Sequence, residues 1–432
     1  MNSMKKVRFA VVGVGRMGGA HAFLLSRGLV KNALLAAVAD ISDGALNSVK
    51  RVCKKGLLCF NSYREMAEKA EFDAVIVAVP HYFHVEIAKF FIEKGKHVLI
   101  EKPIAVTVGE AMEFNRFLKG IEEKTKGIQG KTDEKTEEKE AVGIHKRQEF
   151  NEFLREAEEK TGGIHGNIEE KTGGKPKIAA AVMYNQRTNP VYKKAKELLS
   201  RGAIGEIRRI NFIVTDWYRS DAYYKNNSWR ATWGGEGGGI LINQCVHQLD
   251  VLQWLVGMPK SVYARAVTKG RNIAAENEVT AFLRYENDVF CSLSASGREL
   301  NGTNRIEIAG DSGRLVIGKN SMKFISWKPP EPEVNAATVK GYGGAKKRVK
   351  RYFYGPRSIP DGIFGQQRRI TANFAAHILK GERLISPAQE GIFALSLING
   401  IYMSAWEGKE IEFPIDAERY EELLRERVKE ER

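Results

Sequence analysis

The stretch Val7-Arg8-Phe9-Ala10-Val11-Val12-Gly13-Val14-Gly15-Arg16-Met17-Gly18 decides the fold. An apolar, β-branched run is followed at once by the spacing G-x-G-x-x-G, and such a run is typical of a buried parallel strand. In this pattern Gly13 permits a tight turn, Gly15 lets the backbone approach a pyrophosphate, and Gly18 lets the next helix pack closely. That helix would direct free N–H groups at the phosphates. The residues expected to contact a dinucleotide here are Gly13, Gly15, Arg16, Met17 and Gly18.

A second apolar run, residues 34–39, ends in Asp40. An acidic residue roughly 20 positions after the last glycine accepts hydrogen bonds from the adenosine ribose. Its charge would also repel a 2′-phosphate, so Asp40 favours NAD over NADP. The alternative is a glycine turn in an unrelated α/β protein.

Composition predicts a globular protein of two domains. The chain has 432 residues, of which 43% are hydrophobic and 28% charged, and this length exceeds one ordinary core. It contains no uncharged apolar run long enough to span a membrane, and its start does not resemble a signal peptide. Four cysteines without C-x-x-C spacing indicate reduced thiols. We expect a cytoplasmic protein that binds neither a metal nor a membrane.

The net charge of +15 raises the question of nucleic-acid binding. The densest basic stretch, residues 340–357, interleaves lysines and arginines with tyrosine and phenylalanine and contains no acid. Basic and aromatic residues together are found in nucleic-acid grooves. They also occur in loops beside an anionic substrate, in subunit contacts and on solvated surfaces. We expect a surface, interface or site-adjacent loop, and no nucleic-acid partner.

Strands and helices continue to alternate after Asp40. Apolar runs at residues 72–79 and 97–100 predict further strands, and Thr107 with Glu110 predicts a capping box at the next helix. This order indicates an α/β fold with a doubly wound parallel sheet. We assign residues 1–187 to this NAD-binding Rossmann domain.

Residues 121–167 differ in amino-acid composition from the rest of that domain. They are rich in Glu, Lys, Thr and Gly. The sequence Ile121-Glu-Glu-Lys-Thr is repeated directly after them as Ile168-Glu-Glu-Lys-Thr. Removing 121–167 would leave an ordinary short connection from helix to strand. We interpret them as a low-complexity insertion in a surface loop, with a partner-binding arm as the alternative.

A second pattern begins near Thr188. Alternating runs at 207–215, 261–267, 279–285, 289–294, 305–309 and 314–317 predict a large, mostly antiparallel open sheet. We assign 188–386 to a substrate and oligomerisation domain of the α/β class. Residues 387–432 are expected to form C-terminal helices that pack back on the domains.

Two motifs carry the chemistry. Glu101-Lys102-Pro103 follows a parallel strand, at the edge where open α/β sheets bind ligands. Gly237-Gly238-Gly239 precedes a helical pattern that places Asn243, His247, Asp250 and Trp254 on one face. Histidine suits proton transfer near neutral pH. Each motif alone is also compatible with a structural role, as a surface ion pair or a core-facing helix.

The order and spacing of these motifs resemble the Gfo/Idh/MocA family of glucose–fructose oxidoreductases and inositol dehydrogenases. The resemblance covers nearly the whole chain apart from 121–167, and includes a late segment from Gly391 to Ala405. It implies an NAD(P)-dependent oxidoreductase that acts on a secondary alcohol or ketone of a sugar or cyclitol. It also implies a homodimer or homotetramer formed through the C-terminal sheet.

The resemblance implies a role for each matching position. Lys102 would hydrogen-bond the reacting oxygen and His247 would take the hydroxyl proton. Many family members carry Asp where this chain has Asn243, which can orient a group but holds no charge. The remaining cofactor positions are Pro80, His81, His84 and Glu101. The remaining substrate positions are Tyr184, Asn185, Arg187, Trp229 and Arg230, beside Asn243 itself.

Two other functions use the same fold. One is a non-catalytic NAD-binding regulator, and the other is a glycosidase-like enzyme with transient NAD redox chemistry. Because this chain has both Lys102 and His247, the sequence favours the dehydrogenase over the regulator.

Overall fold

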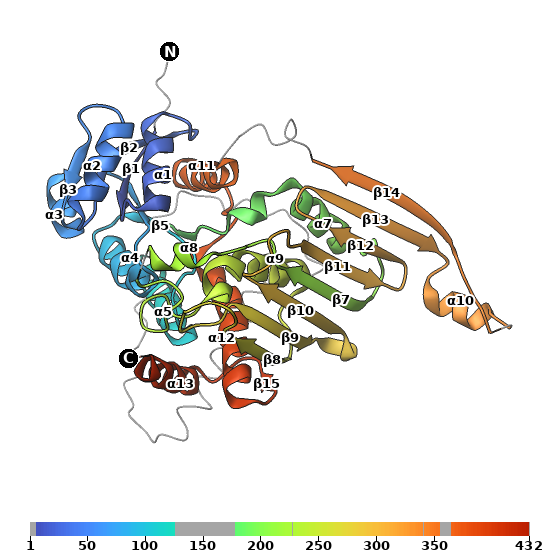
Figure 1. Ribbon diagram of the computed structural model, residues 1–432. Helices are drawn as coiled ribbons and strands as arrows, with labels where there is room; N and C mark the ends of the chain where they lie inside the picture. The colour runs from blue at the N-terminus through green and yellow to red at the C-terminus, as the bar shows by residue number, and fades with distance from the viewer. Residues whose placement is uncertain (1–5, 126–177, 227, 340, 355–363, 432) are drawn as a thin grey trace, which may run out of the picture. The chain divides into compact units, whose positions relative to one another are not determined.

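The computed structural model describes residues 6–125, 178–226, 228–339, 341–354 and 364–431. These residues form two compact units (Figure 1). The first unit takes 6–125, 178–188 and 364–395, and the second takes the remainder. This division differs from the predicted domains in its boundaries. Thr188 and residues 364–386, expected in the second domain, belong to the first unit, and the C-terminal segment 387–431 is divided between the units after Leu395.

The first unit is built on a parallel sheet. Six described strands lie in the order β3-β2-β1-β4-β5-β6, and each neighbouring pair is parallel. This is the Rossmann strand order, which confirms the predicted doubly wound sheet. The strands are β1 (Val7–Val12), β2 (Ala33–Ala39), β3 (Leu58–Phe60), β4 (Ala74–Val77), β5 (His97–Ile100) and β6 (Ala180–Val182).

Two helices of the first unit, α5 and α2, begin at side-chain caps that the sequence displays. The predicted capping box is present, because Glu110 N donates to Thr107 Oγ1 at 3.1 Å and Thr107 N donates to Glu110 Oε2 at 3.1 Å. Ser42 caps α2 in a similar way, by accepting from Ala45 N. The helices are α1 (Arg16–Ser26), α2 (Asp43–Val52), α3 (Tyr63–Lys69), α4 (His84–Glu93), α5 (Val108–Thr125) and α11 (Gly365–Lys380).

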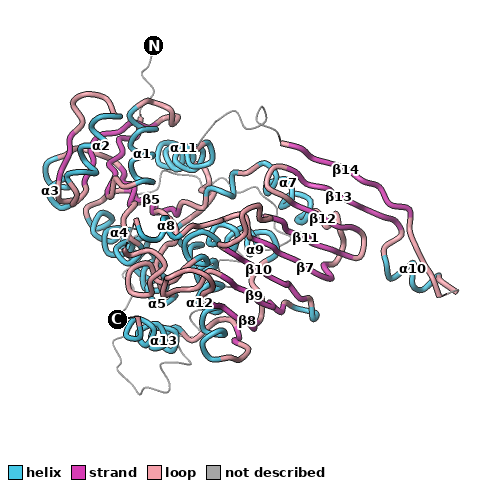
Figure 2. Tube along the Cα trace, in the orientation of Figure 1, coloured by secondary structure: helices cyan, strands magenta, loops and turns pink. Residues whose placement is uncertain are grey.

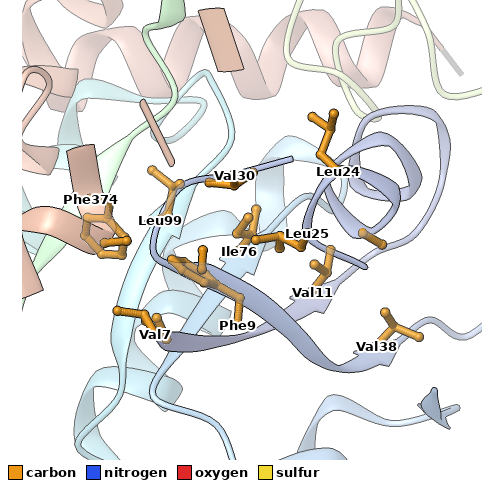
Figure 3. Close-up of a cluster of buried hydrophobic side chains, with 14 of the residues drawn as sticks. Val7, Phe9, Val11, Leu24, Leu25, Val30, Val38, Ile76, Leu99 and Phe374 are labelled. Atoms are coloured by element: carbon orange, nitrogen blue, oxygen red, sulfur yellow. The ribbon is translucent and has the colours of Figure 1, made fainter. Parts of the chain in front are cut away.

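The core of this unit includes a helix that is distant in sequence. Phe374 of α11 lies beside Phe9 of β1, with the ring centroids 6.3 Å apart (Figure 3). Both side chains are fully buried. This contact explains why α11 belongs to the first unit. Of the predicted insertion, residues 121–125 form the last turn of α5, and 126–167 lie outside the described residues.

The second unit is built on a mostly antiparallel sheet (Figure 2). Its described strands follow the order β14-β13-β12-β11-β7-β10-β9-β8-β15, and only the β7–β10 pair among them is parallel. The strands are β7 (Ile207–Val214), β8 (Ser261–Val267), β9 (Glu278–Arg284), β10 (Phe290–Ser296), β11 (Asn304–Gly310), β12 (Gly313–Ile317), β13 (Ser321–Lys328), β14 (Lys346–Phe353) and β15 (Ile411–Glu412).

The basic stretch does not form the predicted loop. Residues 346–353 are strand β14, which pairs with β13 over its whole length. The strand has little apolar periodicity, because its side chains are mostly exposed on both faces. Pairing with β13 therefore determines its conformation, and the sequence pattern gives no signal for it.

One helix of the second unit packs directly against strands of its sheet. Helix α7 (Pro190–Ser200) packs on α9 (Val246–Val256) and on strands β12 and β13. The other helices are α8 (Asp221–Lys225), α10 (Glu331–Ala337), α12 (Gly391–Glu407, shared with the first unit) and α13 (Ala417–Glu430). Within the described ranges, no helix has the length and apolarity needed to cross a membrane.

Candidate functional site

The glycine loop has the geometry that a pyrophosphate needs. Gly13 has φ +80°, and a Cβ there would lie 2.5 Å from the Ala78 carbonyl oxygen. A Cβ on Gly18 would lie 1.7 Å from the Gly13 oxygen, so the helix approaches the strand as closely as glycine allows. A Cβ on Gly15 would meet no described atom within 4 Å. The space beside Gly15 is therefore open, and a side chain there would fill it. We call this open space before α1 the phosphate cradle.

Helix α1 begins at Arg16, directly after this cradle. None of the described side chains caps its N-terminus, and its first turn contains no acid. Its first N–H groups and the positive end of its dipole are thus available to an anion. Arg16 and Met17 lie in that first turn, as predicted for the cofactor loop.

Asp40 lies at the end of β2 and holds the loop in place. Its Oδ2 accepts a hydrogen bond from Val14 N at 2.7 Å, and its Oδ1 accepts from Ser42 N at 2.9 Å. The carboxylate therefore stands beside the glycine loop, where the sequence predicted a ribose-binding acid.

Glu101 anchors the Glu101-Lys102-Pro103 turn after β5. Its carboxylate is buried and lies 2.7 Å from Nε2 of the buried His21 on α1. The second oxygen, Oε2, accepts from Lys102 N at 3.2 Å. The Glu101 carboxylate thus contacts both the Lys102 backbone and His21 on α1. The Lys102 side chain remains partly exposed.

The predicted positions 80–84 divide into two kinds. Pro80 is exposed, whereas His81 and His84 are buried. His84 Nδ1 lies 2.7 Å from the Pro103 carbonyl oxygen and Nε2 lies 2.9 Å from that of Val79. Burial lowers the pKa of His84. The ring therefore links the ends of β4 and β5 from inside the unit, and a direct contact with cofactor does not fit this placement.

Tyr184 and Arg187 are packed inside the first unit. Tyr184 is 0% exposed and donates from its hydroxyl to the Gly391 carbonyl oxygen at 3.3 Å. Arg187 is 1% exposed and pairs with Glu390. The substrate contacts predicted for these two side chains do not fit their burial, because their polar groups hold the chain after β6. Asn185 is also buried, and its Oδ1 accepts no hydrogen bond from any described residue.

In the second unit, a buried carboxylate holds the glycine run before the His247 helix. Glu276 Oε2 accepts from Gly239 N, and Oε1 accepts from Leu241 N and from the Tyr402 hydroxyl, each at 2.9 Å. A Cβ on Gly238 would lie 2.3 Å from that hydroxyl. Burial raises the pKa of Glu276 to about 7. The glycines are thus required by the close approach of these two side chains.

Asn243 lies in a π-helical turn, Leu241–Cys245, that precedes α9. The sequence predicted a continuous α-helix from Ile240, so the π turn was missed. Such turns occur frequently at functional sites. His247 follows in the first turn of α9 and is half-buried. Asp250, by contrast, is fully buried and accepts from Gln253 Nε2 at 2.9 Å.

Glu236 is a buried acid that joins several predicted site residues. Its Oε1 accepts a hydrogen bond from Asn243 Nδ2 and lies 3.7 Å from Arg230 Nη1. Its Oε2 accepts from Ala231 N at 2.7 Å. Arg230 also stacks on the Trp229 ring, with 4.8 Å between the guanidinium carbon and the ring centroid. The structure thus brings Trp229, Arg230 and Asn243 together, as predicted.

Sequence reasoning missed four residues of these arrangements. His21 and Glu276 bond partners that are distant in the chain, Glu101 and Gly239. Glu236 and Tyr223 bond nearer residues: Glu236 accepts from Asn243, and the Tyr223 hydroxyl accepts from Arg230 Nη1 at 2.6 Å. The glycine runs and the predicted helix locate these elements but do not indicate any of the four contacts. Among the described side chains, no three of His, Cys, Asp and Glu are grouped as a metal ion would require.

Two family models match the chain. An oxidoreductase family with an NAD-binding Rossmann fold matches residues 7–124, and the GFO/IDH/MocA C-terminal domain matches residues 192–316. Together these matches cover more than half of the sequence.

Similar proteins agree with these matches. The rhizopine catabolism protein MocA of Rhizobium meliloti is 24% identical over 266 residues, 62% of each chain. An inositol 2-dehydrogenase of Rhizobium meliloti is 23% identical over 94% of this chain and 98% of its own. The WlbA dehydrogenase of Bordetella pertussis, solved with NADH and UDP-GlcNAcA, has the same fold. Its TM-score is 0.68 at 22% identity, over 95% of this chain and 100% of its own. The chain spans 59% and 62% of the length of the first curated relatives that it matches.

Proposed function

This chain belongs to the GFO/IDH/MocA oxidoreductase family, and we propose that it transfers a hydride between NAD and a secondary alcohol or ketone of a sugar or cyclitol. Related proteins support this substrate class. They include the inositol 2-dehydrogenase of Rhizobium meliloti and a levoglucosan dehydrogenase solved with NADH and L-sorbose. Inositol is a cyclitol and L-sorbose is a sugar, so both classes occur among the relatives.

The first unit fits NAD. The cradle at Gly15 and the uncapped start of α1 would receive the pyrophosphate, and Asp40 would accept from the adenosine ribose. The Asp40 carboxylate disfavours the extra phosphate of NADP. When bound, NAD supplies the nicotinamide carbon that accepts or donates the hydride.

Lys102 and His247 carry the proton chemistry in this proposal. Oxidation of an alcohol releases a hydride from carbon and a proton from oxygen. His247 takes the proton on its imidazole, and Lys102 donates a hydrogen bond that stabilises negative charge developing on the same oxygen. In the reverse direction, protonated His247 returns the proton to the ketone oxygen.

One observation carries the assignment. Lys102 and His247 are both left partly exposed, while the backbone that supports each of them is held by a buried carboxylate. Glu101 fixes the Lys102 turn, and Glu276 fixes the glycine run before the His247 helix. Such fixed supports are expected where a reacting group must be held in one geometry.

The test is turnover in the full chain with NAD and a panel of cyclitols, hexoses and their keto forms, measured by the absorbance of the reduced nicotinamide. We expect activity with at least one member. Tight NAD binding without turnover on any member would instead support the non-catalytic regulator.

We also propose that the chain forms a homodimer or homotetramer through the sheet of the second unit. Tyr263, Phe282 and Phe290 are 45%, 54% and 49% exposed on neighbouring strands. Tyr263 lies directly opposite Phe282 in the register, and Phe290 is a diagonal neighbour. An apolar patch of this kind favours association with a second copy. Light scattering of the intact chain and of the Phe282→Glu variant measures the oligomeric state. The intact chain should be a dimer or tetramer, and the variant should be monomeric.

A further inference from the structure

The hydroxyl of Tyr223 receives hydrogen bonds from three side chains. Arg230 Nη1 donates to it at 2.6 Å, Gln244 Nε2 at 3.0 Å and Asn243 Nδ2 at 3.4 Å. A phenolic oxygen has two lone pairs and one hydrogen of its own. The three donors therefore use both lone pairs of the Tyr223 oxygen. The O–H hydrogen must then point away from these donors.

The hydrogen of this O–H has no acceptor among the residues that the structure describes. The ring is only partly buried. Charge-assisted bonding from Arg230 polarises the hydroxyl and makes it a stronger donor. A ligand oxygen within hydrogen-bond distance of the hydroxyl would complete the network.

Two guanidinium groups flank the same ring. The guanidinium carbons of Arg219 and Arg230 each lie 4.7 Å from the Tyr223 ring centroid. The Nε atoms of both are buried and bond no described residue. Arg219 also stacks on Trp217 and forms no ion pair within the described chain. No carboxylate of the described residues therefore lies within ion-pair distance of its guanidinium group.

The local charge is positive. The cluster contains three arginines: Arg219, Arg230 and Arg271. Two of them lie within ion-pair distance of a carboxylate. Asp221 lies 3.6 Å from Arg271, and Glu236 lies 3.7 Å from Arg230 while it also holds Asn243. Arg219, over the Tyr223 ring, pairs with neither of these carboxylates.

We infer that Tyr223, Arg219 and Arg230 form a subsite for an anionic oxygen group, so that the substrate is a sugar or cyclitol bearing a carboxylate or a phosphate. This inference rests on the proposed function, because it specifies the substrate of the same unit that carries His247. The subsite assigns Tyr223 and Arg219 a binding role that the sequence analysis did not give them.

The chemistry of the lining favours an anion over a neutral hydroxyl group. A sugar hydroxyl is both donor and acceptor, so a site for it offers both kinds of partner. Here the polar groups around the Tyr223 ring that bond no described residue are its own O–H and the Nε–H groups of Arg219 and Arg230, and all of them are donors. Carboxylates and phosphates only accept, and hydrogen bonds to them are shorter and stronger. Arginine is also well suited to their planar or tetrahedral oxygens.

The experiment compares matched substrates in the intact protein. Each neutral hexose is paired with its uronic acid and with its phosphate ester, and kcat/KM is measured with saturating NAD. We expect one acidic member to exceed its neutral parent by roughly 10-fold or more, the usual scale for a hydrogen bond to a charged group. The uronate and phosphate arms identify which anion the subsite takes. A neutral parent used as well as both acids would overturn the inference.

Two variants test the residues. Tyr223→Phe and Arg219→Met should each raise KM for the acidic substrate by a larger factor than KM for the neutral parent, so that the preference for the acid falls in both variants. Tyr224→Phe is the matched control, because this neighbouring tyrosine has no part in the network and burial raises its pKa to about 12. Equal losses on acidic and neutral substrates in both variants would indicate a purely structural role and contradict the inference.

Calorimetry separates this inference from the proposed function. Uronate and phosphate ester are titrated into the wild-type protein and into Arg219→Met, both saturated with NADH. Binding to the wild type that weakens in the variant supports the subsite even if no sugar is turned over. Turnover of neutral sugars alone, without binding of either acid, leaves the dehydrogenase intact and rejects the subsite.

Discussion

The side-chain amide of Asn243 donates a hydrogen bond from Nδ2 to the buried carboxylate of Glu236. This contact fixes which end of the amide faces the protein interior. It also returns a negative charge to a place where the family resemblance leads one to expect an aspartate and the chain has an asparagine. Glu236 therefore acts through Asn243 as a positioning residue.

Replacing Glu236 by Gln should lower kcat/KM by roughly 10- to 100-fold, because a charge-assisted hydrogen bond contributes about 1.5–3 kcal/mol and the Asn243 amide loses its fixed orientation. Glu278→Gln serves as the control, since Glu278 bonds Ser296 and Arg298. NAD affinity, measured by fluorescence, should be the same in both variants. Unchanged kinetics in Glu236→Gln would reject the positioning role.

Glycines 15 and 18 should respond differently to alanine. A Cβ on Gly18 would collide with the Gly13 backbone oxygen, whereas a Cβ on Gly15 would enter open space. Gly18→Ala should therefore lower the free energy of unfolding. Gly15→Ala should fold normally and bind NAD less tightly, because the methyl group occupies the phosphate cradle. Thermal unfolding and NAD titration measure the two effects, and wild-type NAD affinity in Gly15→Ala would contradict the assigned cradle.

Lys102→Ala and His247→Ala should each lower kcat by roughly 10²–10⁴, the usual contribution of general acid–base catalysis. The fold and NAD affinity should remain, because neither side chain supports the buried contacts described above. Rates like those of the wild-type protein in both variants would refute the catalytic assignment.

Glu276 should make stability depend on pH. Burial raises its pKa from 4.5 to about 7 in the folded protein. Between these values the folded protein holds a proton that the unfolded chain has released, so the free energy of unfolding falls as pH rises from about 4.5 to about 7. Glu276→Gln lacks this ionisation, and its stability relative to wild type should rise across the window. Urea unfolding at several pH values measures the free energy of unfolding of both proteins. If the two proteins showed the same dependence on pH, the raised pKa of Glu276 would be contradicted.

Deleting residues 121–167 should leave NAD binding and turnover intact. The deletion joins Gly120 to Ile168-Glu-Glu-Lys-Thr, which repeats the sequence of the last turn of α5. The helix therefore keeps its residues across the new junction. The same assays on the shortened chain test this prediction, and loss of soluble or active protein would show that the insertion has a role.

Local sequence patterns predicted the elements well where burial follows periodicity. Strands β5 and β8 have the predicted bounds, and the Thr107–Glu110 capping box is present. These features depend on neighbouring residues, which a sequence displays directly. The order of motifs then sufficed to indicate the family.

Features that depend on distant contacts could not be read from the sequence. Strand β14 exists because β13 pairs with it, and the π turn at Asn243 lies beside a glycine run held by Glu276 and Tyr402. The burial of Arg187 and its ion pair with Glu390 likewise had no signal in the sequence. Charged residues in particular are misread, because their burial depends on a partner elsewhere in the chain.

Strand β14 has a consequence for how the protein behaves at high concentration. It is the edge of the nine described strands and presents five basic side chains within Lys346–Phe353. Exposed edge strands are templates for uncontrolled sheet growth, and closely spaced lysines and arginines discourage it by repulsion. A second copy that approached edge to edge would set these charges against one another. The basic run therefore disfavours edge-to-edge pairing, and the proposed self-association would use the face of the sheet instead.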